Sequence, residues 1–318
     1  MPPKSLLLCF ICVTAFAQNP DTVALEAQAV SLRELVERAP ALPLHRTEVK
    51  LQSPGAGWGI GYPSSVAMDK AGLLYVLQRG EKADPVLVVD QNGRIIRSWG
   101  KGMFKIPHSI RIDPSGNIWT VDAASSMIFK FTPMGEKMME ISVGGQPAAK
   151  SGFAGTTDIA FAPNGHLFIS DGYGNARVLE YTADGKRLRE WGSAGTGPGQ
   201  FRQPHGIAVD ENGVVYVADR QNGRVQRFDQ TGKYLGEWAN LGMVTTVAIS
   251  GGALWIGTQQ RNVPTSATGW LMKIDRRSGK ILGHIDSARG HHVVNVTAKG
   301  DLLSGARPDT VLWFRAVK

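Results

Sequence analysis

Three histidines occupy equivalent places in a repeated sequence pattern, and imidazole is a common ligand of zinc and related divalent ions. They lie in the stretches KIPHSI, RQPHGI and GHHVVN, at His108, His205 and His292. Three imidazoles with an open fourth position form the ligand set of a catalytic zinc site. One such histidine could simply be bonded to nearby backbone, whereas three at equivalent positions favour a shared metal ion.

His291 directly precedes His292 and is an alternative third ligand. In the other two stretches the next turn glycine comes eight residues after the histidine, and the same count selects His292. The remaining histidines follow no such position, so we assign no role to His45, His166 or His284.

A repeat must position the histidines, because six copies of one pattern run through the chain. Each copy has an apolar segment, an Asx-Gly turn, a second apolar segment, a third alternating segment, a turn glycine and a fourth segment that often ends in tryptophan. Four short strands per copy are typical of a β-propeller blade. The copies recur every 40 to 50 residues and begin at Ser65, Ser109, Asp158, Gly206, Thr246 and Val294.

The sequence therefore predicts an all-β fold, a six-bladed β-propeller of four-stranded NHL-type blades over residues 45–318. The sixth copy ends after its third strand, so we expect residues 45–53 to complete the last blade and close the ring. The histidines belong to copies two, four and six. Because alternate blades of such a ring are about 120° apart, these side chains should converge on its axis. Residues 18–44 precede the ring, and a capping box at Ser31–Glu34 predicts a short helix there.

The first 17 residues, MPPKSLLLCFICVTAFA, have the lysine, apolar run and small-residue cleavage site of a secretory signal peptide. We expect a secreted or periplasmic mature chain that begins at Gln18, has no membrane span and is a monomer. Both cysteines, Cys9 and Cys12, would leave with this segment, so the mature chain would have no disulfide. Its 34 basic residues (35 less Lys4) exceed its 27 acidic ones, but they are scattered, which argues against nucleic-acid binding.

Three stretches carry a resemblance to a known family: MFKIPHSIRIDPSGNIWTVD around His108, LFISDGYGNARVLEY around Tyr173, and GQFRQPHGIAVDENGVVYVADRQNGRVQRF around His205 and Arg220. They resemble the peptidyl-α-hydroxyglycine α-amidating lyases, which are six-bladed propellers. The resemblance covers residues 60–318. Members of the family cleave a C-terminal α-hydroxyglycine into a peptide amide and glyoxylate.

The resemblance implies a zinc ion on the three histidines, Tyr173 as general base, and Arg79 and Arg220 as the groups that hold the substrate carboxylate. These residue types suit the reaction, since the hydroxyl of a hemiaminal must lose its proton as nitrogen leaves, and an arginine fork fits a carboxylate. Each also has a structural alternative. Tyr173 could pack on a neighbouring blade, and Arg220 could form an ion pair with Asp219.

The family's structural calcium ion would take the backbone carbonyls of Val66 and Ile110 and an acidic side chain directly after the third histidine. That residue is Val293 here, so the sequence leaves calcium binding open. Two functional classes follow. One is a secreted zinc lyase that acts on an α-hydroxyglycine peptide or a related hemiaminal, and the other is a non-catalytic NHL propeller that binds a peptide, glycan or protein partner.

Overall fold

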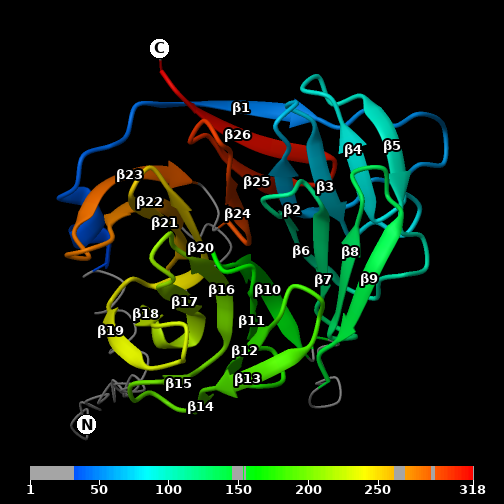
Figure 1. The fold of residues 1–318 in the computed structure, drawn as a ribbon. Helices are drawn as coiled ribbons and strands as arrows, with labels where there is room; N and C mark the ends of the chain where they lie inside the picture. The colour runs from blue at the N-terminus through cyan, green and yellow to red at the C-terminus, as the bar shows by residue number, and fades with distance from the viewer. Residues whose placement is uncertain (1–31, 145–152, 154, 261–268, 288–290, 318) are drawn as a thin grey trace, which may run out of the picture.

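The computed structural model describes residues 32–144, 153, 155–260, 269–287 and 291–317. The expected signal peptide, residues 1–17, lies outside the described residues, as does Ser31 of the expected capping box. Within the described ranges, six four-stranded antiparallel sheets surround a central axis as the blades of a propeller (Figure 1). The predicted fold class is therefore confirmed.

The first five blades are each built from four consecutive strands, with the first strand nearest the axis. Blade 1 contains β2 (Pro63–Met68), β3 (Leu74–Gln78), β4 (Val86–Val89) and β5 (Ile95–Trp99). Blade 2 contains β6 (Pro107–Ile112), β7 (Ile118–Asp122), β8 (Met127–Phe131) and β9 (Lys137–Ser142). Blade 3 contains β10 (Thr156–Phe161), β11 (Leu167–Asp171), β12 (Arg177–Tyr181) and β13 (Arg187–Trp191).

The next two blades follow the same order. Blade 4 contains β16 (Pro204–Val209), β17 (Val215–Asp219), β18 (Arg224–Phe228) and β19 (Tyr234–Trp238). Blade 5 contains β20 (Met243–Ser250), β21 (Ala253–Gln259), β22 (Gly269–Asp275) and β23 (Ile281–Ser287). Between blades 3 and 4, β14 (Ser193–Ala194) pairs with β15 (Gln200–Phe201), and the short helix η1 (Arg220–Asn222) follows β17.

Blade 6 joins the two ends of the described chain. Its strands are β24 (Val294–Val296), β25 (Leu302–Arg307), β26 (Thr310–Ala316) and β1 (Leu44–Lys50), the last of which pairs with β26 along its whole length (Figure 1). The predicted closing strand is thus confirmed, although it ends at Lys50. Beyond it, Gln52 forms a bridge to Arg94 in blade 1. The N-terminal strand therefore covers the sheet edge that an incomplete sixth blade would expose.

The core lies between neighbouring blades, because alternating residues on each strand turn their apolar side chains towards the adjacent sheet. Tyr75 and Val86 of blade 1, for example, share one buried cluster with Ile118 of blade 2. The tryptophan that ends the fourth strand also contacts the next blade. A Cβ at Gly135, where φ is +94°, would lie 2.7 Å from the ring of Trp99. This contact explains why the repeat pairs a terminal tryptophan with a turn glycine.

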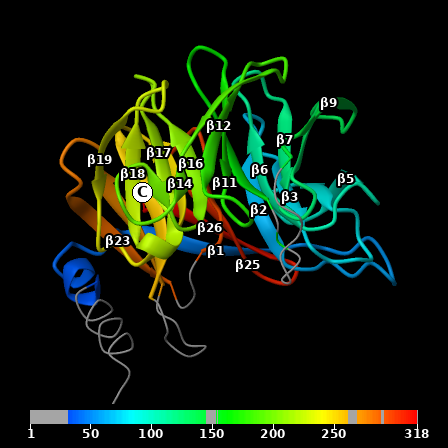
Figure 2. The same ribbon diagram turned by 90° about the horizontal axis from the view of Figure 1, so that it is seen from below.

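Residues 32–37 form a short helix that packs outside the ring, near β23 (Figures 1 and 2). Leu32 and Val36, which lie one turn apart on the same face, are buried against blades 4 and 5. Within the described part of the chain, no helix has the length and apolarity that a membrane crossing requires.

Candidate metal centre and active site

The three predicted histidines meet at one end of the central channel. His108 lies on β6 and His205 on β16, while His292 lies just before β24. Their ring centroids are 4.5 to 4.9 Å apart, and one nitrogen of each ring lies within 4.8 Å of the other two. His291 is held elsewhere, because its Nδ1 lies 2.9 Å from the hydroxyl of Ser304. The structure therefore groups His292, and not His291, with the other two histidines.

Backbone carbonyls of the neighbouring blades orient two of these rings. His108 Nδ1 lies 2.5 Å from the carbonyl oxygen of Thr157, and His205 Nδ1 lies 2.6 Å from that of Thr245. Because a carbonyl only accepts hydrogen bonds, each Nδ1 carries the proton and each Nε2 directs its lone pair into the channel. Metal-binding histidines usually make this second hydrogen bond, which fixes the tautomer and the ring orientation.

Sequence reasoning missed the residues that provide these carbonyls. Ser64, Thr157 and Thr245 occupy in blades 1, 3 and 5 the position that histidine occupies in blades 2, 4 and 6. Ser64 is the matching residue beside His292, but among the described residues His292 Nδ1 makes no hydrogen bond. The alternation of histidine with a small hydroxyl residue around the ring is the sequence signal that identifies them.

Tyr173 brings its hydroxyl to the same point. The oxygen lies 2.9, 3.0 and 3.4 Å from the Nε2 atoms of His108, His205 and His292. Tyr173 follows β11, and the chain before it runs close to blade 4, where a Cβ at Gly172 would collide with the backbone of Pro204. Glycine at position 172 therefore allows the approach that places the phenol over the imidazoles.

Arg79, which directly follows β3, is partly buried close to Tyr173. Its Nε donates to the carbonyl of Pro107 at 2.9 Å, whereas its buried Nη2 has no hydrogen-bond partner among the described residues. In the described ranges, no carboxylate offsets the positive charge of Arg79. A partly buried guanidinium with a free N–H group is suited to an anionic ligand.

Arg220 opens η1 and also lies close to Tyr173. Its Nη1 donates to the Gln203 side chain at 3.3 Å, and its buried Nε has no partner within the part of the chain that the structure describes. The ion pair with Asp219 considered from the sequence is not formed, because Asp219 instead pairs with Arg224 at 2.9 Å. Both predicted arginines therefore reach the site with unused donors.

Burial sets the protonation of the cluster. Together with neighbouring positive charges, it lowers the pKa of His108 and of His205 well below 6.5 and the pKa of His292 to about 3. Burial also raises the pKa of Tyr173 to about 12, and the two arginines offset part of this rise. At neutral pH the imidazoles and the phenol are therefore uncharged. The two arginines remain charged, so the site carries a net positive charge.

This donor set fits a zinc ion or another divalent ion suited to imidazole. Three neutral imidazoles come from separate blades, two of them from innermost strands and His292 from the segment just before one. Two of the rings are fixed by hydrogen bonds, and a hydroxyl oxygen lies beside them. The structure thus brings together all six residues predicted for the metal and catalytic site: His108, His205, His292, Tyr173, Arg79 and Arg220.

Recurring aspartates at the ends of second strands support the site indirectly. Asp122 accepts a hydrogen bond from the backbone N–H of Ile106 at 2.6 Å, and Asp219 accepts one from that of Arg202 at 2.7 Å. The segments that they bind lead into β6 and β16, which carry two of the histidines. These aspartates are structural, as their recurrence with the repeat indicates.

Comparisons with known proteins agree with the propeller fold. The NHL repeat model matches residues 201–228, which include His205 and Arg220. The peptidyl-glycine alpha-amidating monooxygenase of Mus musculus is 33% identical over 213 residues, a match that covers 57% of this chain and 22% of that protein. The peptidyl-alpha-hydroxyglycine alpha-amidating lyase 2 of Drosophila melanogaster is 32% identical over 257 residues, which covers 74% of this chain and 60% of that protein.

The chain belongs to the peptidyl-α-hydroxyglycine α-amidating lyase family of NHL-repeat propellers. This member of the family spans 22% of the length of the two rodent monooxygenases that it matches. Among solved structures, a virginiamycin B lyase from Staphylococcus aureus with quinupristin aligns with a TM-score of 0.63 at 16% identity, over 86% of this chain and 100% of that one. That likeness supports the propeller fold.

In this amidating-lyase family member, Phe153 is a further site residue that sequence reasoning missed. Its ring centroid lies 4.7 Å from that of Tyr173, and the Arg79 guanidinium lies 5.7 Å from its centre. It belongs to the segment between β9 and β10, and no repeated feature of the sequence distinguishes it.

The two carbonyls to which the family resemblance assigns calcium lie farther along the channel. Val66 O and Ile110 O both accept hydrogen bonds from Asn295 Nδ2, at 2.7 and 3.2 Å. Val293, which replaces the acidic residue of the family, is 2% exposed and packed in the interior. In this chain the carbonyls therefore face an N–H donor, and the residues present do not fit a calcium ion.

Proposed function

We propose that the protein is a secreted zinc-dependent lyase that cleaves the N–C bond of a C-terminal α-hydroxyglycine, or of a related hemiaminal, to an amide and glyoxylate. The observation that supports this function is the convergence of three neutral imidazoles and the Tyr173 hydroxyl beside two partly buried guanidinium groups. The names of the relatives in Drosophila melanogaster and Caenorhabditis elegans support the same reaction. Secretion rests on the pattern of residues 1–17.

Substrate binding in this proposal begins with the carboxylate of the hydroxyglycine. Arg79 and Arg220 both lie close to Tyr173, and each has a buried N–H group without a partner in the described ranges. A carboxylate placed between them would satisfy these donors and neutralise positive charge that burial makes costly. This placement would leave the hydroxyl on the adjacent carbon next to the phenol and the imidazoles.

Tyr173 is the group that would move the proton. A zinc ion on the three histidines would supply positive charge that makes nearby hydroxyl groups more acidic. Without such charge the pKa of Tyr173 is about 12, so the phenol is a donor and not a base at neutral pH. As a phenolate, it would accept the proton of the substrate hydroxyl while the N–C bonding electrons leave with nitrogen.

The same tyrosine can complete the reaction. The former O–H bonding electrons form the carbonyl of glyoxylate, and the amide nitrogen needs one proton. Tyr173 would return to nitrogen the proton that it took from oxygen, so that substrate and products balance. Phe153 and the surrounding blades cover the phenol, which is mostly buried, and thus limit competing proton exchange with water.

Release of glyoxylate from a short hydroxyglycine-terminated peptide tests the proposal. We expect the zinc-loaded mature protein to release glyoxylate, and the protein stripped of metal to release none above the uncatalysed rate. If the protein holds about one metal ion per chain on its histidines and still releases no more than the stripped protein, the proposed activity is wrong. The non-catalytic binding propeller would then be the better hypothesis.

A further inference from the structure

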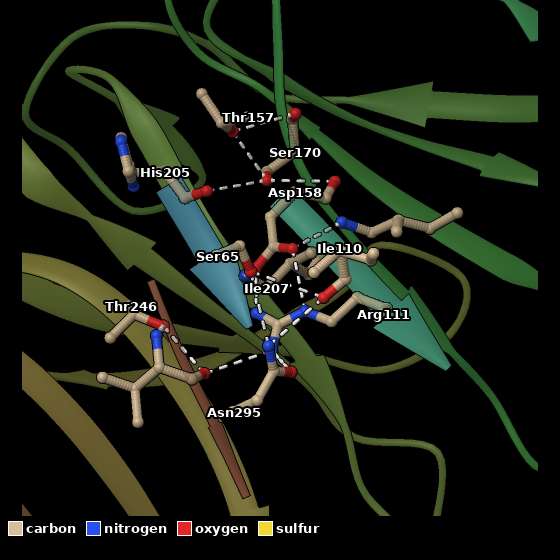
Figure 3. Close-up of polar contacts among 12 residues, drawn as sticks. Ser65, Ile110, Arg111, Thr157, Asp158, Ser170, His205, Ile207, Thr246 and Asn295 are labelled. Carbon is tan, nitrogen blue, oxygen red and sulfur yellow. Dashed lines mark hydrogen bonds and ion pairs between the residues drawn. The ribbon is translucent and has the colours of Figure 1, made fainter. Parts of the chain in front are cut away.

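A second buried polar cluster closes the channel beyond the histidines (Figure 3). It consists of Arg111 on β6, Asp158 on β10 and Asn295 on β24, which we call the arginine layer. The Arg111 side chain is 11% exposed and that of Asp158 is 2% exposed, so an ion pair forms almost entirely inside the protein. Beyond it lies a cavity of about 260 Å³ at the opposite end of the channel.

Arg111 uses its whole guanidinium fork in this layer. Its Nε donates to Asp158 Oδ1 at 3.0 Å and its Nη2 donates to Asp158 Oδ2 at 2.5 Å. Its Nη1 donates to the carbonyl of Val294 at 3.1 Å and to the side-chain oxygen of Asn295. Bidentate pairing of this kind gives the strongest hydrogen bonds available to a buried arginine.

These contacts fix the orientation of the Asn295 amide. Its oxygen faces the guanidinium, so its nitrogen must face the carbonyls of Val66 and Ile110, at 2.7 and 3.2 Å. The opposite orientation would place oxygen against two carbonyl oxygens and nitrogen against the donors of Arg111. The amide nitrogen therefore occupies the side of the carbonyls where a cation would bind.

We infer that the arginine layer replaces the channel calcium ion of the family, with the Arg111 guanidinium as an internal cation, so that this propeller neither binds nor requires calcium in its channel. Calcium takes six or more oxygen ligands at about 2.3 to 2.6 Å. Here the two carbonyls face an N–H group, the Asp158 carboxylate is already paired, and a guanidinium charge lies in the same layer. An ion would have to displace every one of these contacts.

The layer can replace a structural ion because it links the inner strands of five blades directly and that of blade 5 through Val294, whose carbonyl accepts a hydrogen bond from Arg111. Asp158 on β10 also accepts a weak hydrogen bond from the backbone of Ile207 on β16, at 3.4 Å. Thr246 on β20 accepts one from Val294 on β24 at 3.2 Å. Val66 on β2 and Ile110 on β6 accept hydrogen bonds from Asn295, and Arg111 also lies on β6. Each of the six blades thus contributes a residue to this set of hydrogen bonds. This inference concerns stability and is independent of the proposed activity.

Calcium content and thermal unfolding of the full mature chain test the inference. Buffers stripped of calcium and supplemented with zinc keep the histidine site loaded, which a chelator would not. We expect a melting temperature that changes by less than about 1 °C when millimolar calcium is added, because an ion that binds only the folded state would raise it by several degrees. Calcium near one ion per chain, or a clear rise in melting temperature, would overturn the inference.

A double variant tests whether the arginine layer is the cause. Arg111→Gln with Asn295→Asp removes the internal cation and directs a carboxylate at the carbonyls of Val66 and Ile110. We expect this variant to melt at a lower temperature than the parent without calcium and to regain several degrees with it. Arg307→Gln, which removes an exposed ion pair with Glu48, is the control and should not respond. If the double variant folds and its melting temperature does not change with calcium, Arg111 is not the group that replaces the ion. If the variant fails to fold, the calcium measurements on the parent protein decide.

Discussion

The channel contains two layers of buried polar side chains that differ in how many of their hydrogen-bonding groups are already used. The histidine layer comprises His108, His205, His292, Tyr173, Arg79 and Arg220. There, three Nε2 atoms share one hydroxyl group, and each arginine keeps a buried nitrogen that no described residue pairs with. In the arginine layer, all three guanidinium nitrogens of Arg111 and both oxygens of Asp158 are bonded within the protein.

Unpaired buried polar groups distinguish the binding site from the structural network. Unpaired buried polar groups are costly, so a cluster that retains them gains stability when a ligand supplies the missing partners. A cluster with complete pairing gains nothing from a ligand and instead holds its strands together. β6 carries a member of each layer, His108 and Arg111, so the same short strand serves both purposes.

The largest expected effect is the loss of activity in His205→Ala. Two imidazoles hold zinc poorly, so metal content should fall sharply and glyoxylate release should drop to that of the stripped protein. Metal analysis and the glyoxylate assay measure both. His291→Ala is the matched control, since that side chain contacts Ser304 outside the cluster, and it should keep its metal. Near-full occupancy in His205→Ala would refute the metal site.

Arg111→Leu should have the opposite profile, with stability lost and the histidine site intact. Removal of one partner leaves Asp158 as an uncompensated buried charge, so we expect the free energy of unfolding to fall by about 3 to 5 kcal/mol. Urea unfolding measures this change. Arg111→Leu combined with Asp158→Leu should recover part of the loss, because both charges are then gone. Equal stability of Arg111→Leu and the parent would contradict the structural role of the layer.

Tyr173→Phe removes only the ionisable hydroxyl and keeps the ring that packs against Phe153. We expect kcat for glyoxylate release to fall by about 10²-fold or more while metal content and melting temperature stay near those of the parent. Steady-state kinetics with the hydroxyglycine peptide provide the measurement. A variant with parental kcat would show that another group moves the proton.

Arg220→Lys should have the smallest effect of the four substitutions. A lysine keeps the charge but loses the planar fork, so kcat/KM should fall by roughly tenfold, the value of one charge-assisted hydrogen bond. Arg315→Lys, on the outer part of blade 6, is the control and should leave kcat/KM unchanged. An unchanged kcat/KM in Arg220→Lys would remove this arginine from carboxylate binding.

Much of the fold and of the histidine layer could be predicted from the sequence. The repeat sets the strand order, the missing strand of the sixth copy predicts closure by the N-terminal strand, and equal offsets in the repeat select His292 over His291. These features are predictable because each depends on local pattern and on the symmetry of the ring. Tyr173 and the two arginines came from the family resemblance, since their positions do not recur.

The sequence by itself determined that six similar blades would form and that alternate blades would bring three histidines to one axis. Only the tertiary structure decided which ring nitrogen of His108 and of His205 carries the proton, because the Thr157 and Thr245 carbonyls belong to neighbouring blades. It alone also showed that Asn295 meets Val66 and Ile110, across 229 and 185 residues of sequence. Such contacts depend on distances between blades, which no local sequence pattern records. For that reason only the three-dimensional structure shows which buried hydrogen-bonding groups have partners and which do not.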